Sequence, residues 1–501
     1  MTEPSQTPLD TRRCGATNFM MDFSFSTPKT PHPCGHRRPL ALALAMALSL
    51  WLVACTSVRT PYQAPQVVVP GTWSHPGAVV TAPADGPDAW WGAFGDPQLD
   101  TLVEAALSRN NDLAVAALKV NKARLQAELA ERNRWPTLSA SVSTQGQKPL
   151  DGGVSTRSSG ASVSVSYEAD LWNRLGSLSE VSRWESLATE QDRQATRLSL
   201  IGSVLQAYWQ LAYLNQRIST GEQSVAYAEK TRDLVQAQYR AGAVSALEAS
   251  EAERTVLSQR ATLADLQQQR LSARTTLALL LDVAPSDTAL QPWLSAEPQR
   301  LPLQAMPEVA AGLPAQLLAR RPDLRAAEMR LRETLASADA TAASYYPALT
   351  LTGALGSSSL ALGQVLSNPY ALLGAGVTLP FLQVNTMKLN NAIARTQYES
   401  AVVSFRQTLY SALGDVENAL SNRGALARQG ELLAGSLAAS RRSEQLYEVR
   451  YRQGSVALSL WLDAQETRRT AETAWAQNQL SQLKNQVTLY LALGGSAQMA
   501  P

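Results

Sequence analysis

The sequence predicts a mixed α and β protein of two similar halves, each with one β-hairpin and very long helices that pack as a coiled bundle. Three observations support this fold class. Sequence patterns recur at an offset of about 210 residues. Within each half the hydrophobic period changes from helical spacing to strict alternation and back. Two stretches of more than 60 residues contain no proline.

Composition narrows the class of protein. The 501 residues are 45% hydrophobic and 17% charged, which excludes a disordered chain. The 44 Lys and Arg residues nearly balance the 42 Asp and Glu residues, so no nucleic-acid partner is expected. A single apolar stretch near the N-terminus approaches the length of a membrane helix. A transmembrane β-barrel stays open as an interpretation, because alternating strands leave little trace in average composition.

The duplication is visible in two pairs of segments. Asp112-Leu113 and Asp323-Leu324 are 211 residues apart, and each stands 24 residues before a proline. The Tyr-Arg-x-Gly-x-Val segments that begin at Tyr239 and Tyr451 are 212 residues apart. Two pairs in the same order with nearly equal offsets indicate a duplicated half of about 210 residues.

Each half begins with a helix that leads into a hairpin. Apolar residues recur at helical spacing from Leu99 to Arg134, and Pro136 ends this helix. Apolar residues then alternate with small residues, which predicts one hairpin in each half. In the first half one face of the hairpin is apolar and the other carries small polar residues. The predicted strand segments are 138–143, 161–167, 349–352 and 373–379, and the predicted loops are 144–160 and 356–372.

Long helices follow each hairpin. Asn173 to Tyr239 contains no proline and three glycines, and Asn385 to Tyr451 is its counterpart. At 1.5 Å per residue such a helix is about 100 Å long. Each ends in a glycine-containing turn and returns as a shorter helix, Ser245 to Leu281 or Leu458 to Leu493. An apolar stripe of this length has no single core to face, so it belongs to a bundle.

The N-terminus has the pattern of a secretory leader. A basic segment ending at Arg38 precedes an apolar run of about 15 residues, which is short for a membrane helix and suits a signal peptide. The alternative is a single anchoring helix. The leader is long, so the start of translation is expected at Met20 or Met21.

The whole chain is therefore expected to divide into six segments. The predicted segments are 1–54 for the signal peptide, 55–90 for an N-terminal arm, 91–282 for the first repeat, 283–318 for a Pro-rich connector, 319–495 for the second repeat and 496–501 for the tail.

Cysteine and histidine usage argues against thiol and common metal chemistry. Of three cysteines, Cys14 and Cys34 fall in the leader and Cys55 follows it. His75 is the one histidine after the leader, so a zinc or iron site with nitrogen and sulfur ligands is not expected. No Walker, Rossmann or Gly-x-Ser-x-Gly motif occurs. We therefore expect no cofactor, no metal and no catalytic residue.

These features resemble the TolC-like outer-membrane efflux family, in particular its lipoprotein branch with NodT and OprM. The resemblance extends from about Trp90 to Gly495. Each matching stretch is short, and their order, spacing and duplication make the match specific. The stretches are Trp90-Trp-Gly-Ala-Phe-Gly-Asp-Pro97, Tyr167-Glu-Ala-Asp-Leu-Trp172, Arg320-Arg-Pro-Asp-Leu324 and the two Tyr-Arg-x-Gly turns.

The resemblance implies a homotrimer in the outer membrane. Each chain would give four strands to one shared twelve-stranded transmembrane β-barrel, which long helices continue as an α-helical tunnel across the periplasm. Two hairpins with apolar faces cannot close a barrel alone, and lipid does not tolerate open sheet edges. The apolar residues would face lipid and the serine and threonine residues would face a lumen.

The end of the leader resembles a bacterial lipobox. In Leu52-Val53-Ala54-Cys55 the cysteine would be diacylated and become the first residue of the mature chain. The next residue is Thr56 rather than aspartate, which by the same resemblance favours sorting to the outer membrane.

The two glycine turns would be periplasmic tips that dock an adaptor protein. A left-handed turn between two helices is by itself sufficient reason for glycine. The predicted tip residues are Gly242, Ala243, Val244, Ser245, Gly454, Ser455 and Val456.

The family often places acidic residues just past the second tip, where three copies form a constriction. Asp463 matches one such position, whereas Leu460 replaces the other. The first half offers Glu248 and Glu251. A ring of carboxylates would repel anions, although an acidic residue on a helix is more often part of a solvated face.

The predicted function is a passive exit duct for small molecules in a tripartite efflux system. Its partners would be a periplasmic adaptor and an inner-membrane transporter of the RND or another type. A type I secretion channel for proteins is the alternative within the same fold. A lipid-anchored coiled-coil structural protein is the alternative from another class, and an enzyme is not expected.

Overall fold

The computed structural model describes residues 59–74, 89–294, 297–302, 314–316, 320–360, 362–364 and 367–495. The chain divides into two compact units, Met1–Thr56 and Ser57–Pro501, and all described elements belong to the second. The predicted signal peptide, Cys55 and the tail lie outside the described residues.

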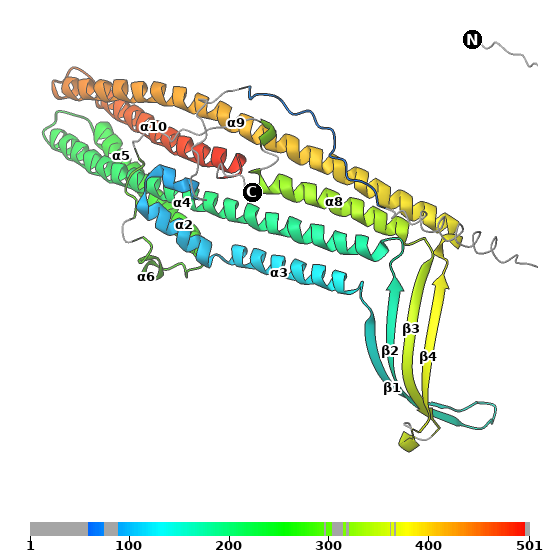
Figure 1. The fold of residues 1–501 in the computed structure, drawn as a ribbon. Coiled ribbons are helices and arrows are strands. Elements are labelled where there is room, and N and C mark those ends of the chain that lie inside the picture. Colours follow the sequence, from blue (N-terminus) through cyan, green and yellow to red (C-terminus); the bar gives the residue numbers. More distant parts are fainter. Residues whose placement is uncertain are drawn as a thin grey trace, which may run out of the picture. The chain divides into compact units, whose positions relative to one another are not determined.

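Two long helical hairpins and one sheet dominate the described fold (Figure 1). Helices α4 (Arg174–Arg240) and α9 (Val384–Arg452) have 67 and 69 residues, so each is about 100 Å long. They return as α5 (Ala246–Leu280) and α10 (Leu458–Ala492), each of 35 residues. The predicted long helices are thereby confirmed. In the described part of the chain, no helix combines the length and apolar character needed to cross a membrane.

The remaining helical elements are shorter. They are η1 (Trp90–Phe94), α2 (Pro97–Arg109), α3 (Asn111–Arg132), α6 (Asp287–Leu290), η2 (Pro314–Gln316), α8 (Pro322–Ala343), η3 (Leu362–Gln364) and η4 (Pro380–Leu382). Helices α3 and α8 each precede a hairpin, as the duplication requires.

The first helix was predicted to be continuous from Leu99 to Arg134, and this prediction is wrong. It is divided into α2 and α3 at Asn110, whose ψ of 130° is extended. The Asn110 side chain accepts a hydrogen bond from the Leu113 amide at 3.1 Å and donates one to the Leu280 carbonyl at 3.0 Å. Asparagine is a favoured N-cap, so this residue begins α3 and ties it to the end of α5.

The four strands form one antiparallel sheet in the order β1-β2-β3-β4. The serines of the first hairpin lie opposite one another, and the hydroxyls of Ser139 and Ser164 are 2.8 Å apart. Leu138 lies opposite Val165 on the other face. The predicted polar and apolar faces are therefore present. The strands are β1 (Thr137–Gln147), β2 (Thr156–Ala169), β3 (Ala348–Ser359) and β4 (Pro369–Thr378).

The loops between the strands are shorter than predicted. Pairing continues to Gln147 opposite Thr156 in the first hairpin and to Ser357 opposite Pro369 in the second. The connections are therefore 148–155 and 360–368 rather than 144–160 and 356–372. The outer parts of the strands are rich in glycine and serine, and backbone pairing needs no alternation of apolar side chains.

The junction between sheet and helices explains the Tyr-Glu-Ala-Asp-Leu-Trp stretch. Glu168 forms an ion pair with Arg174 at 2.7 Å, and the Asp170 carboxylate accepts from the first backbone amides of α4. The Trp172 indole donates to the Pro347 carbonyl, at the aromatic-proline step of the second half, at 2.9 Å. The stretch therefore joins β2, α4 and the beginning of the second hairpin.

A buried cluster lies where α2, α4 and α10 meet. Trp90 stacks on Tyr490 with ring centroids 4.7 Å apart. Asp96 caps α2 by accepting from the Gln98 amide, and it also accepts from the Tyr208 hydroxyl at 2.6 Å. The Trp-Trp-x-x-Phe-x-Asp-Pro stretch is thus explained by packing and capping.

Residues 59–74 form an arm across the helices, drawn in dark blue (Figure 1). The backbone amide and hydroxyl of Thr60 donate to the buried carboxylate of Asp339 in α8, at 2.9 and 2.7 Å. At the other end Trp73 is buried in an apolar cluster with residues of α9 and α10, among them Leu409 and Leu489. The arm is thus fixed at both of its ends.

We predict that Asp339→Ala releases the start of the arm. A hydrogen bond to a charged group contributes about 1.5–3 kcal/mol, so the amide of Thr60 should exchange with deuterium at least about tenfold faster. Hydrogen-exchange mass spectrometry measures this rate. Asp265→Ala is the control, because its exposed carboxylate accepts from Gln269 of the same helix. Unchanged exchange at Thr60 would show that other contacts hold the arm.

Candidate functional site at the helical tips

Both helical hairpins end in the same type of turn. Gly242 and Gly454 have φ values of 74° and 71°, in the left-handed region that favours glycine. The amide of each glycine donates to the carbonyl three residues earlier, and the next amide donates to the carbonyl five residues earlier, at 2.8–2.9 Å. This pattern satisfies the last carbonyls of a helix. The sequence identified these turns correctly from the Tyr-Arg-x-Gly pair.

The predicted tip residues divide into exposed and packed positions. The two glycines, Ala243 and Ser455 are exposed. Val244 and Val456, one or two residues further on, pack against a buried tip cluster. The backbone of each turn is therefore exposed, and the valine that follows it holds its conformation by packing into the tip cluster.

The tip cluster joins all four long helices. It contains Val235 of α4, Ala252 of α5, Tyr451 of α9 and Trp461 of α10. Trp461 stacks on Tyr451 with ring centroids 5.1 Å apart and meets the edge of Tyr227 at 6.2 Å. A buried tryptophan is a major source of packing energy, so the two hairpins are held together here.

The duplicated tyrosines have different environments. Tyr451 is 7% exposed and its hydroxyl donates to the Gln238 amide oxygen at 2.7 Å. Its counterpart Tyr239 is 48% exposed. The sequence repeat predicts equivalent environments for the two tyrosines. Within one chain, however, each hairpin packs against the other along one side only, so Tyr451 lies in the contact and Tyr239 lies outside it. The Tyr451 hydrogen bond therefore links the end of α9 to the end of α4.

A network of charges, partly buried around Glu444 and Arg468, lies beside the tip cluster. Arg468 contacts Glu444 at 2.6 Å and Glu472 at 2.8 Å, and Arg441 also contacts Glu472 at 3.0 Å. Burial raises the pKa of Glu444, and the adjacent Arg468 opposes this rise. Sequence reasoning missed this network, because Glu444 and Arg468 lie on different helices and helical spacing cannot reveal their contact.

The candidate gate residues follow the second tip. Leu460 and Asp463 are exposed on α10, whereas Trp461 and Leu462 between them are buried. Leu460 and Asp463 are three residues apart and so share one face of the helix. Glu251 is half-buried on α5, at the position equivalent to Asp463. These placements leave the role of the three residues as a prediction.

Glu248 has a structural role at the first tip. Its carboxylate accepts from the Ser245 amide at 2.6 Å and completes a capping box at the start of α5. The second tip has Ala457 at the N-cap, without a side-chain hydrogen bond, and Leu460 in place of the glutamate. Ser245 is the N-cap of α5 and belongs to the same capping box. The sequence-based assignment of Ser245 to the tip did not include this structural role.

The family model described as "Outer membrane efflux protein" matches residues 102–282 and 313–495. The chain belongs to the outer membrane efflux protein family. The two matched segments correspond to the two halves inferred from the duplication, and the resemblance seen in the sequence is confirmed.

Individual relatives cover nearly all of this efflux protein. It is 32% identical over 468 residues to the pyoverdine export outer membrane protein OpmQ of Pseudomonas putida, covering 90% of this chain and 97% of the relative. It is 32% identical over 407 residues to toxin and drug export protein A of Aggregatibacter actinomycetemcomitans, covering 81% and 88%. The open-state MtrE outer membrane channel of Neisseria gonorrhoeae has a TM-score of 0.75 and 29% identity, covering 89% and 99%.

These matches confirm the predicted location, fold class and general function. The efflux protein acts in the outer membrane, and its fold combines long helical hairpins with a β domain. The family consists of channels rather than enzymes. Trimer formation, lipidation, adaptor docking and the gate stay predictions.

We predict that Gly454→Ala strains the second tip. An alanine in the left-handed conformation costs about 1–2 kcal/mol, and no heavy atom within 4 Å of the added Cβ would add a clash. The amides of residues 454 and 455 should therefore exchange with deuterium about tenfold faster. Gly414→Ala is the matched control, because Gly414 lies inside α9 with the same open space and should be slightly stabilised. Equal exchange in both variants would contradict strain at the turn.

Proposed function

We propose that this efflux protein is the outer-membrane exit duct of a tripartite export system. It passively conducts small molecules that an inner-membrane transporter delivers through a periplasmic adaptor. The observation that carries the proposal is a sheet with two open edges and an apolar face, joined directly to helices of about 100 Å that end in exposed turns. Such a sheet suits lipid, and helices of this length suit a conduit through the periplasm.

A homotrimer would close the barrel. Among the described residues β1 and β4 each have one edge without a partner strand, and lipid does not tolerate unpaired backbone groups. Helix α3, which precedes β1, has an unpacked apolar stripe in which Leu118, Leu125 and Leu129 are more than half exposed. We propose that three copies pair β4 with β1 of the next copy, which gives twelve strands and covers the stripe.

The adaptor would dock on the exposed turns. Gly242, Ala243, Gly454 and Ser455 offer backbone groups at the surface, and the tip cluster beneath keeps their shape constant. Preformed backbone lowers the entropic cost of association, which favours this surface for a protein partner.

The constriction would lie just beyond the second tip. Leu460 and Asp463 share an exposed face of α10, so three copies would place an apolar and an acidic ring one turn apart. We propose that Asp463 disfavours anions and that Leu460 contributes an apolar seal. Glu251 of α5 would add carboxylates near the same level.

A lipid anchor at Cys55 agrees with the course of the arm. Arg59, four residues after Cys55, contacts Glu180 at 2.8 Å. Glu180 belongs to the first turns of α4, directly after the junction with the sheet. The first described residues of the arm thus lie at the membrane-proximal end in this proposal.

The cargo is proposed only as a class. One relative is named for pyoverdine export and another for toxin and drug export, although both are 32% identical to this chain. Different cargoes at equal similarity support a duct whose selectivity resides in the inner-membrane transporter. Because the second relative is named for toxin export, a secretion channel for proteins is the second candidate function. We propose conduction without a catalytic step in either case.

The channel proposal predicts cation-selective pores. Protein purified from outer membranes should run as a heat-modifiable trimer and conduct ions in planar bilayers. Asp463→Asn should lower the permeability of potassium relative to chloride by at least about twofold, because it removes a ring of carboxylates. Asp265→Asn, at an exposed position of α5, should leave this ratio unchanged. Recovery as a soluble monomer without conductance would contradict the duct.

The anchor proposal predicts that Cys55→Ser abolishes acylation. Metabolic labelling with palmitate should mark the wild-type protein and leave the variant unlabelled, because the thiol is the acyl acceptor. Cys34→Ser is the control and should keep the label. A labelled Cys55→Ser protein would rule out the lipobox assignment.

A further inference from the structure

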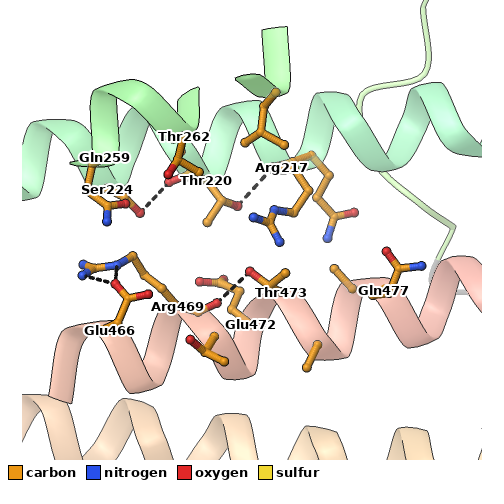
Figure 2. Close-up of a pocket in the computed structure, with 16 residues that line it drawn as sticks. Arg217, Thr220, Ser224, Gln259, Thr262, Glu466, Arg469, Glu472, Thr473 and Gln477 are labelled. Atoms are coloured by element: carbon orange, nitrogen blue, oxygen red, sulfur yellow. Dashed lines mark hydrogen bonds and ion pairs between the residues drawn. The ribbon is translucent and has the colours of Figure 1, made fainter. Parts of the chain in front are cut away.

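A cavity of about 390 Å³ lies between the two helical hairpins (Figure 2). Residues of α4, α5 and α10 line it, one hairpin on each side. Its volume is roughly ten times the ~30 Å³ share of one water molecule. It lies between the tip cluster and the cluster around Trp90, at a level where neither apolar cluster fills the space.

Two arginines from opposite sides reach into this cavity. Figure 2 shows Arg217 extending from α4 toward α10, and Arg469 extending from α10 toward α4 and α5. The Nη1 atom of each is buried and has no hydrogen-bond partner among the described residues. The Arg469 side chain is 11% exposed. Buried donors in folded proteins are nearly always paired, so two unpaired guanidinium N–H groups at one cavity require a partner.

The carboxylates of the cavity are already neutralised. Glu466 contacts Arg469 at 2.8 Å, and Glu472 is shared by Arg468 and Arg441. Neither Glu466 nor Glu472 forms an ion pair with Arg217 among the described residues. Arg217 therefore brings a positive charge that no described carboxylate contacts, whereas Glu466 balances Arg469.

The neutral side chains that line the cavity carry both donors and acceptors. The Gln216 amide oxygen accepts from the Leu301 amide at 3.1 Å, which leaves its NH2 group as the remaining polar group of that side chain. Gln259 and Gln477 also line the cavity, and their amides can turn a donor inward. The hydroxyls of Thr220 and Thr473 donate to carbonyls of their own helices. These hydroxyls can therefore only accept from a ligand, so the donors available to an anion are the N–H groups of the arginines and glutamines.

We propose that this cavity binds a small oxyanion, a phosphate or a carboxylate-bearing molecule, between Arg217 and Arg469. A planar guanidinium matches the two oxygens of an oxyanion, which a halide cannot offer. The anion bridges α4 to α10 and so links the two hairpins of one chain. The site depends on this chain alone and not on its proposed role as a duct.

Calorimetric titration of the full-length, detergent-purified protein with inorganic phosphate tests the site, with sodium chloride at matched ionic strength as the reference. Wild type should bind phosphate saturably, and Arg217→Gln should weaken binding at least tenfold. Arg395→Gln is the matched control, because Arg395 is 82% exposed and forms one pair with Glu399 of the same helix. Unchanged affinity in Arg217→Gln, or no saturable binding by wild type, would overturn the proposal.

Thermal unfolding separates a ligand site from a structural role. Phosphate should raise the melting temperature of wild type above its value in chloride, and this rise should vanish in Arg217→Gln. In chloride alone the variant should be at least as stable as wild type, because it removes an unpaired buried donor. A variant that melts earlier in chloride and still gains stability from phosphate would show that Arg217 is structural and would contradict the site.

Discussion

The unpaired edges of β1 and β4 are the constraint on which the rest of the structure depends. In lipid each unpaired backbone group costs several kcal/mol, so the sheet is stable in a membrane only when other copies complete it. Ring closure would fix the spacing between copies, and the junction transmits that spacing to the helices. Asp170 caps α4 directly after β2, and Trp172 binds the carbonyl of Pro347. In the proposed trimer the long helices would therefore inherit their arrangement from the sheet.

Packing along the helices alternates between apolar and polar zones. The cluster around Trp90 ends near Ile218 of α4, and the tip cluster begins near Tyr227. Between them lie the cavity and the charges around Arg468. Buried ion pairs add less stability than an apolar core of the same volume but restrict the register of their partners. The charges around Arg468 join α9 to α10 within the second hairpin, whereas the Tyr227 hydroxyl of α4 donates to Glu448 of α9 at 3.1 Å and so joins the two hairpins.

Periodicity along the chain predicted most of the fold but little of the site. The limits of α4, α5, α9 and α10 were readable because proline, glycine and long stripes are local signals. The break at Asn110 was missed, because a residue that caps one helix while binding Leu280 depends on a contact 170 residues away. The same reason hid the Glu444 network and the arginines of the cavity. Duplication located both tips, yet it could not show that Tyr451 would be buried and Tyr239 exposed.

The two tips differ in how the returning helix is held at its start. The first has a capping box from Ser245 and Glu248, whereas the second begins at Ala457 without one. Loss of an N-cap costs about 1 kcal/mol, whereas the first turns of α10 bury Leu458 and Trp461 in the tip cluster. The first turn also carries Leu460, and Asp463 follows it. In the proposed duct, the residues nearest the constriction would therefore lie on a helix start that is held by packing rather than by a cap, and the hydrogen bond from Tyr451 to Gln238 would tie the end of α9 to α4.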